Sequence, residues 1–168
     1  MRVYFTTVVR GAPVEDGGSL VCVDWDRKKV LRAVDIVPRD PTIDDPNPRG
    51  STRGGRGIMR VGEHLYVASY HSLLEFTDDL RLVDKHSHGL FAGLHEIDSD
   101  SSGLYVSATS IDAALKVTPK GDVLESWWPR EMSFLKARYG LTPLEIDKAG
   151  DNRDQFLEQK HLKGSHVH

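Results

Sequence analysis

Hydrophobic and polar residues alternate along three stretches of the chain, and each stretch is followed by a second and a third alternating run. The three opening stretches are Val3–Val9, Leu65–His71 and Leu104–Ser110. A period of two places successive side chains on opposite faces of an extended chain, so each run predicts a β-strand. Short polar segments separate the later runs, and they have the composition of tight hairpin turns: DWDRKK, TDDLR and TPKGD.

The three stretches repeat one another. Tyr4, Tyr66 and Tyr105 fall at the same position of each unit, and Leu65 and Leu104 are 39 residues apart. A further strand precedes the aromatic one in two units, with the sequences GIMRV and LHEID. A period of about 40 residues with four strands per unit is typical of a β-propeller blade.

The sequence therefore predicts an all-β protein, a partial β-propeller of about three four-stranded blades, equal to half of a six-bladed ring, with a small helical insertion near the C-terminus. The whole chain, 1–168, is one partial propeller domain. Its expected parts are blade 1 (3–37), a loop insertion (38–56), blade 2 (57–90), blade 3 (93–129), a helical lid (130–165) and the start of a next blade (166–168).

A propeller ring closes with about four to eight blades, because each blade buries both faces against its neighbours. Three blades alone would leave two apolar faces uncovered. We expect a second protein chain, or a missing remainder of the same protein, to complete the ring; two copies meeting as three plus three blades is the other possibility.

Net charge, cysteine content and the length of apolar runs exclude several classes of function. The net charge of −3 is too small to steer the chain to nucleic acid or to an anionic membrane. Cys22 is the one cysteine, so it forms no internal disulfide, and its setting in SLVCVDW favours a core position over redox chemistry. No signal peptide or membrane-spanning run is evident, which predicts a cytoplasmic protein.

Two long insertions interrupt the repeat at equivalent places, 38–56 and 129–165. The second contains two helical patterns, Arg130–Gly140 and one beginning at Asp151. In a propeller the connections before the first strand and after the second strand of each blade emerge at one mouth of the channel. We expect both insertions to form a lid there, and the functional site to lie beneath it.

Histidines open the predicted inner strands at this mouth: His95, His166 and His168. Neutral imidazole binds zinc, iron and similar ions, and ligands from separate blades can surround one ion. These three are the candidate metal ligands, with calcium the less suitable ion. The alternative is that they are hydrogen-bonded residues filling a polar channel.

Residues that end the second strands lie on the same rim. We assign a catalytic role to His71 and Asp112, and a substrate-binding role to Tyr70. The segment PNPRGSTRGGRG adds Arg53 and Arg56 among glycines, as an anion clamp or as a loop held by ion pairs with upstream aspartates.

The phrase LYVSA followed by ALKVTPKGDVLESW resembles the six-bladed propeller superfamily of NHL-repeat, gluconolactonase-like and strictosidine-synthase-like proteins. The resemblance covers the three blades and leaves out both insertions. It implies a divalent metal at the channel mouth, held in the hydrolase branch by carboxylates and amides, where this chain offers mainly histidine.

The leading hypothesis is a metal-dependent propeller enzyme, a hydrolase, lyase or oxidoreductase, acting on a small anionic substrate at the lidded mouth. The alternative is a non-catalytic propeller scaffold that binds a protein or peptide there.

Overall fold

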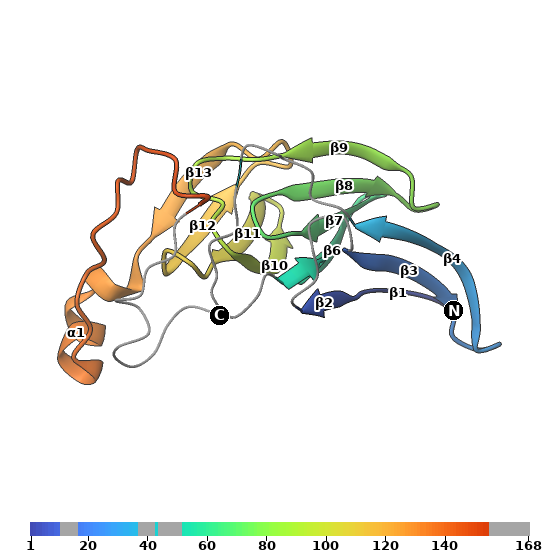
Figure 1. The fold of residues 1–168 in the computed structure, drawn as a ribbon, viewed down its shortest axis with the longest axis horizontal. Coiled ribbons are helices and arrows are strands. Elements are labelled where there is room, and N and C mark those ends of the chain that lie inside the picture. The colour runs from blue at the N-terminus through green and yellow to red at the C-terminus, as the bar shows by residue number, and fades with distance from the viewer. Residues whose placement is uncertain (11–16, 37–42, 44–51, 155–168) are drawn as a thin grey trace.

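Three antiparallel sheets follow one another along the long axis of the molecule (Figure 1). The computed structural model describes residues 1–10, 17–36, 43 and 52–154. We call the sheets blades 1 to 3 in chain order. Their strands are β1 (Arg2–Thr6), β3 (Gly18–Asp24) and β4 (Lys29–Ile36) in blade 1; β6 (Ile58–Val61), β7 (His64–Ala68), β8 (Leu73–Thr77) and β9 (Leu82–His86) in blade 2; and β10 (Leu94–Asp100), β11 (Gly103–Ala108), β12 (Ala113–Val117) and β13 (Val123–Trp127) in blade 3.

Blades 2 and 3 each have four strands in sequence order, whereas blade 1 has three among the described residues. The inner strands β6 and β10 have no counterpart beside β1 there. This agrees with the prediction that the first repeat lacks its opening strand.

The repeated sequence positions are also repeated in space. Tyr4 pairs with Cys22 between β1 and β3, Tyr66 with Glu75 between β7 and β8, and Tyr105 with Lys116 between β11 and β12. The three tyrosines therefore occupy one structural position, as the sequence repeat predicts.

The last turn of blades 2 and 3 is built by the same chemistry. The hydroxyl of Thr77 accepts the Arg81 N–H at 3.1 Å, and that of Thr118 accepts the Asp122 N–H at 3.1 Å. Between them, Leu80 and Gly121 adopt left-handed backbone with φ of 61° and 85°. Such a conformation disfavours leucine, and burial of the Leu80 side chain in the core between blades 1 and 2 compensates for it.

Each blade has two different faces. We call the face toward the preceding blade the leading face and the face toward the next blade the trailing face. In blade 2 the leading face carries Leu65 and Val67, which pack with Leu20 and Cys22 of blade 1. Its trailing face carries Tyr66 and other side chains, which pack on the leading face of blade 3. The two clusters form the core.

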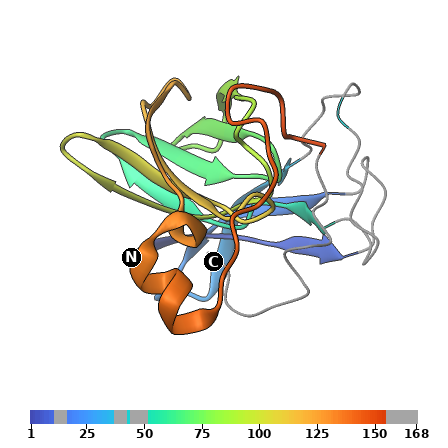
Figure 2. The ribbon, with the colours of Figure 1, turned by 90° about the vertical axis from the view of Figure 1, so that its left-hand side faces the viewer.

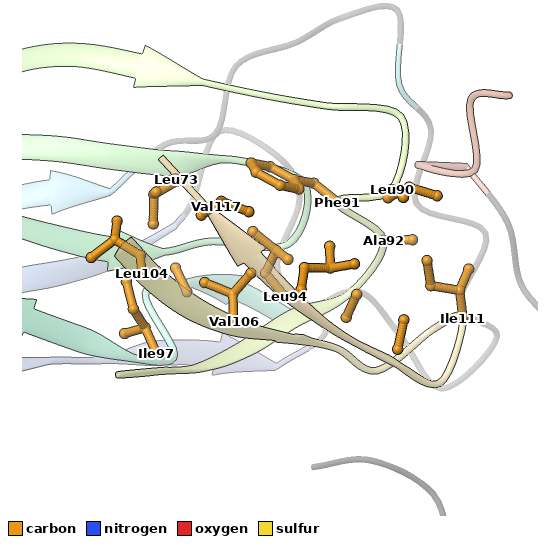
Figure 3. Close-up of a cluster of buried hydrophobic side chains, with 14 of the residues drawn as sticks. Leu73, Leu90, Phe91, Ala92, Leu94, Ile97, Leu104, Val106, Ile111 and Val117 are labelled. Carbon is orange, nitrogen blue, oxygen red and sulfur yellow. The ribbon is translucent and has the colours of Figure 1, made fainter. Parts of the chain in front are cut away.

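The connection between blades 2 and 3 contributes the largest fully buried side chain, Phe91. Figure 3 shows Phe91 in one cluster with Leu73 of blade 2 and with Val106 and Val117 of blade 3. Leu90 and Ala92 flank it and are also buried. The connection is therefore part of the core between blades 2 and 3.

Residues 3–9, predicted as one strand, form two. β1 ends at Thr6, and β2 (Val8–Arg10) leaves blade 1 to pair with β5 (Thr52–Gly54). Thr7 marks the break: its N–H donates to the Ser19 carbonyl, and its hydroxyl accepts the Ser19 N–H, both at 2.8 Å. The predicted loop 38–56 therefore contains a short strand.

The segment after blade 3 begins with a 3-10 turn, η1 (Pro129–Glu131), and continues as α1 (Ser133–Tyr139). The helix ends at Gly140, whose backbone is left-handed, in agreement with the predicted stop. No side chain of α1 is buried, and Figure 2 shows the helix on the outside of the sheets. Residues 151–154 form no helix, and the rest of the second predicted helix lies outside the described residues.

No helix in the described part of the chain has the length and apolar character needed to cross a membrane.

Tyr66 provides a test of the interface between blades 2 and 3. Burial, followed by the charge of Glu75, raises the pKa of its hydroxyl from 10.0 to about 12. The unfolded chain then loses this proton at a lower pH than the folded protein, so the stability that neutral Tyr66 contributes is present below pH 10.0 and is lost as the pH rises toward 12.

We expect the stability difference between Tyr66→Phe and the parent protein to shift in favour of the variant by about 2 kcal/mol between pH 8 and pH 12. Urea unfolding at several pH values measures it. Phe76→Leu, a core change without an ionisable group, should show one deficit at every pH. An equally pH-independent difference for Tyr66→Phe would contradict the burial of the hydroxyl.

Candidate functional site

The connections at one edge of blades 2 and 3 are joined by backbone hydrogen bonds. Leu94 N–H donates to the Tyr70 carbonyl at 2.8 Å, Ser110 N–H to Ala92 at 3.0 Å, and Asn152 N–H to Gly89 at 2.7 Å. Segments far apart in the sequence therefore meet at this edge. We call it the rim and define it by residues 56–57, 69–72, 87–96, 109–112, 129–130 and 147–153.

Tyr70 and His71 lie inside the rim. Both are buried, and their rings meet edge to face with centroids 6.3 Å apart. His71 Nδ1 lies 2.9 Å from the Ser72 hydroxyl, and its carbonyl accepts the Ser87 hydroxyl at 2.6 Å. These contacts hold the imidazole in place and tie the loop after β7 to the connection after β9.

Asp112 is held by an ion pair. Its backbone is left-handed, with φ of 55°, and its carboxylate accepts a hydrogen bond from Nε of Arg130. Both side chains are buried. Arg130 also donates to the Thr142 carbonyl at 3.4 Å. The pair therefore fixes the segment after blade 3 onto the loop between β11 and β12.

Arg153 links two segments of the rim. Arg153 donates to both carboxylate oxygens of Asp151, at 2.8 and 2.6 Å, and to the Ser87 hydroxyl at 3.1 Å. The hydrogen bonds from Arg153 lower the pKa of Asp151, with a smaller contribution from the charge of His71. Asp151 is therefore kept as a carboxylate close to the His71 loop.

His95 opens the exposed part of the rim. Its Nδ1 lies 2.9 Å from a carboxylate oxygen of Glu96, and its side chain is partly exposed. The Glu96 N–H donates to the Ser107 hydroxyl at 2.9 Å, which fixes the backbone that carries both side chains. A neighbouring carboxylate that holds one ring nitrogen sets the orientation and the proton position of an imidazole.

The backbone of Arg56 lies close to this part of the rim, in the neighbouring blade. Its N–H donates to the Ala68 carbonyl at 2.8 Å, just before β6 begins. Gly57 follows and lies against the backbone of His95; a Cβ there would come within 2.7 Å of the His95 carbonyl oxygen. The close approach brings the starts of β6 and β10 together, which requires glycine at this position.

Three predicted site residues, Arg53, His166 and His168, remain. The backbone of Arg53 lies in β5. His166 and His168 lie outside the described residues. Among residues 1–10, 17–36, 43 and 52–154, no three His, Cys, Asp or Glu side chains are grouped closely enough to hold a metal ion. The metal ligand set therefore stays a prediction.

Arg130, Asp151 and Arg153 are rim residues that the sequence reasoning missed. The sequence predicts Arg130 and Asp151 as the first residues of two helical patterns and assigns them no role at the rim. The one available signal was the Asp151–Arg153 spacing, which allows a forked contact within a turn.

No family model and no curated protein matches this chain. Among solved structures, the chain is similar to the WD40 domain of Pan2 from Neurospora crassa, with 12% identity and a TM-score of 0.51. The match covers 74% of this chain and 34% of that one, so this chain spans about a third of the matched structure.

A likeness at this identity shows the fold alone. Together with the three sheets, it confirms the predicted fold class: the chain is an all-β partial propeller with one short helix toward its C-terminus. The predicted resemblance to the NHL-repeat and gluconolactonase-like superfamily stays a prediction.

Proposed function

We propose that the protein is a metal-dependent propeller enzyme that acts on a small anionic substrate at the rim. The observation that carries this proposal is the pairing of His95 with Glu96, next to the start of β6 where Arg56 lies. An imidazole held by a carboxylate is suited to binding a metal ion, and the guanidinium of Arg56 is proposed to supply the positive charge for the anionic ligand.

The donor chemistry of His95 fits zinc or iron as one ligand. In histidines that bind metals, the second ring nitrogen commonly contacts a carboxylate. Nδ1 of His95 contacts the carboxylate of Glu96 in this way. The described residues offer no complete set, so the proposal assigns the remaining positions to His166 and His168. A bound ion would supply Lewis-acid polarisation of the substrate.

Arg53 and Arg56 are proposed to hold the anionic part of the substrate, since guanidinium groups bind carboxylate and phosphate through forked hydrogen bonds. Tyr70 is proposed to bind the substrate, and His71 and Asp112 to take part in catalysis. The contacts with Ser72 and Arg130 described above hold His71 and Asp112 in place.

Metal analysis tests the proposal directly. Purified protein should contain close to one zinc or iron ion per chain by elemental mass spectrometry, and less than about 0.1 per chain would overturn the proposed function. His95→Ala should lose the metal. Glu96→Gln should keep the imidazole but weaken metal affinity by roughly 10- to 100-fold, because it removes the charge that orients the ring.

A matched control is available in blade 2. His64 also lies against a carboxylate, that of Glu75, but it is in β7 and outside the rim. His64→Ala should keep the full metal content. If His95→Ala and His64→Ala bind metal equally, His95 is not a ligand.

A non-catalytic scaffold is the second candidate. It is favoured by the mutual pairing of buried polar side chains at the rim, where Asp112 and Arg130 neutralise one another. For a scaffold, metal content should be negligible, and Arg56→Ala should leave the affinity for small anions such as phosphate or citrate unchanged.

A further inference from the structure

The leading face of blade 1 is apolar and partly exposed to solvent, although Val21 near its middle is only 9% exposed. Register places Val3, Val23 and Val30 in one cross-strand row, and Phe5, Val21 and Ala33 in the next. Phe5 is 42% exposed and Val30 57%. Leu20 and Cys22, on the opposite face, pack on blade 2, so these two rows are the ones that no described blade covers.

The equivalent rows of the other blades are buried on their inner strands, whereas Leu82, which corresponds to Val30, is 53% exposed on the outer strand of blade 2. Phe5 corresponds to Val67 of blade 2 and Val106 of blade 3, which are at most 3% exposed. In both cases the cover is the trailing face of the preceding blade, which carries Tyr4 or Tyr66. The protein thus contains two examples of one interface, apolar leading face against tyrosine-bearing trailing face.

The trailing face of blade 3 is the other half of that interface, and it also faces solvent. Tyr105 is 40% exposed, whereas Tyr66, at the same position of blade 2, is 5% exposed. Lys116 lies over the Tyr105 ring, 5.9 Å from its centroid, and binds Glu125 at 3.2 Å. This pair resembles the contact on the trailing face of blade 2, where Glu75 lies 3.2 Å from His86.

We propose that the leading face of blade 1 binds the trailing face of blade 3 in a second copy of this chain. One chain carries both halves of an interface that it already forms twice internally. Two copies joined at both ends would close a ring of six blades, which is within the range of about four to eight that propellers adopt. The proposal does not depend on the chemistry of the rim.

Solution mass tests this assembly. At about 100 µM, light scattering after size exclusion should give twice the chain mass of 18.8 kDa. Phe5→Glu and Tyr105→Glu should each reduce it to one chain mass, because each places a charge in both interfaces of the ring. The control Phe134→Glu changes an exposed residue of α1 and should keep the doubled mass.

A mixture of the Phe5→Glu and Tyr105→Glu variants distinguishes the proposed assembly from a dimer in which the same face of each copy pairs with itself. A Phe5→Glu chain and a Tyr105→Glu chain can form one unaltered interface between them, so the mixture should recover part of the doubled mass. If Tyr105→Glu alone stays dimeric, blade 1 pairs with itself and the proposal is wrong. A parent protein that stays at one chain mass also overturns it.

Folding of each variant is checked by circular dichroism and thermal unfolding. If Phe5→Glu unfolds, Val3→Glu takes its place, since the residues at the same position of blades 2 and 3, Leu65 and Leu104, are at most 2% exposed. A folded Val3→Glu protein that keeps the doubled mass would contradict the proposal.

Discussion

Arg130→Met should lower the free energy of unfolding by about 3 to 5 kcal/mol, because it leaves the buried carboxylate of Asp112 without its counter-charge. Methionine retains much of the arginine side-chain volume, so loss of packing adds little. Urea or guanidinium unfolding at neutral pH, with two-state analysis, measures the effect.

Two further variants isolate the charge. Asp112→Asn combined with Arg130→Met removes both charges and should recover a large part of the loss; asparagine also tolerates the left-handed backbone at this position. Glu131→Gln breaks the nearby exposed pair with Lys148 and should cost less than about 1 kcal/mol. If Arg130→Met costs no more than Glu131→Gln, the buried pair does not hold the segment after blade 3.

The architecture could be predicted because it is repeated. The equivalence of Tyr4, Tyr66 and Tyr105 and the matching polar turns are local features of the sequence, and the structure places both as expected. Alternation of period two then decides which residues face each neighbouring blade, so the two core clusters follow from the same pattern.

The pairing of β2 with β5 could not be predicted in the same way. Alternation shows that Val8–Arg10 is extended, but it does not show which distant segment supplies the hydrogen-bond partner. Gly18 and Gly54 allow that partner to approach, since a Cβ on either residue would meet the Thr7 carbonyl. A glycine needed for close approach looks, in sequence, like a glycine of a loop.

The candidate site, too, could be predicted only where it depends on the repeat. Strand position brought Tyr70, His71, Asp112 and His95 to one rim, and this arrangement follows from the repeat. The partner of Asp112 and the contacts of Arg153 come from the segment after Trp127, and a non-repeated segment carries no pattern that predicts its path. For this reason the sequence does not predict the roles of Arg130 and Arg153. The roles of Arg53, His166 and His168 stay predictions.

Phe91→Ala should be among the most destabilising single changes in the chain, at about 3 to 5 kcal/mol. The ring is fully buried between blades 2 and 3, in the connection that leads into β10 (Figure 3). Its removal leaves a cavity among the packed side chains of both blades. Chemical denaturation of the variant and the parent protein measures the loss.

Phe134→Ala is the matched control, since the same side chain is 69% exposed on α1; it should change stability by less than about 0.5 kcal/mol. A further consequence separates the connection from the blades. Loss of Phe91 should speed amide hydrogen exchange at Leu94, whose N–H is bonded to Tyr70, more than at Val67 in the middle of β7. Equal acceleration at both amides would show that the ring stabilises the whole sheet stack, and that the rim has no separate dependence on this connection.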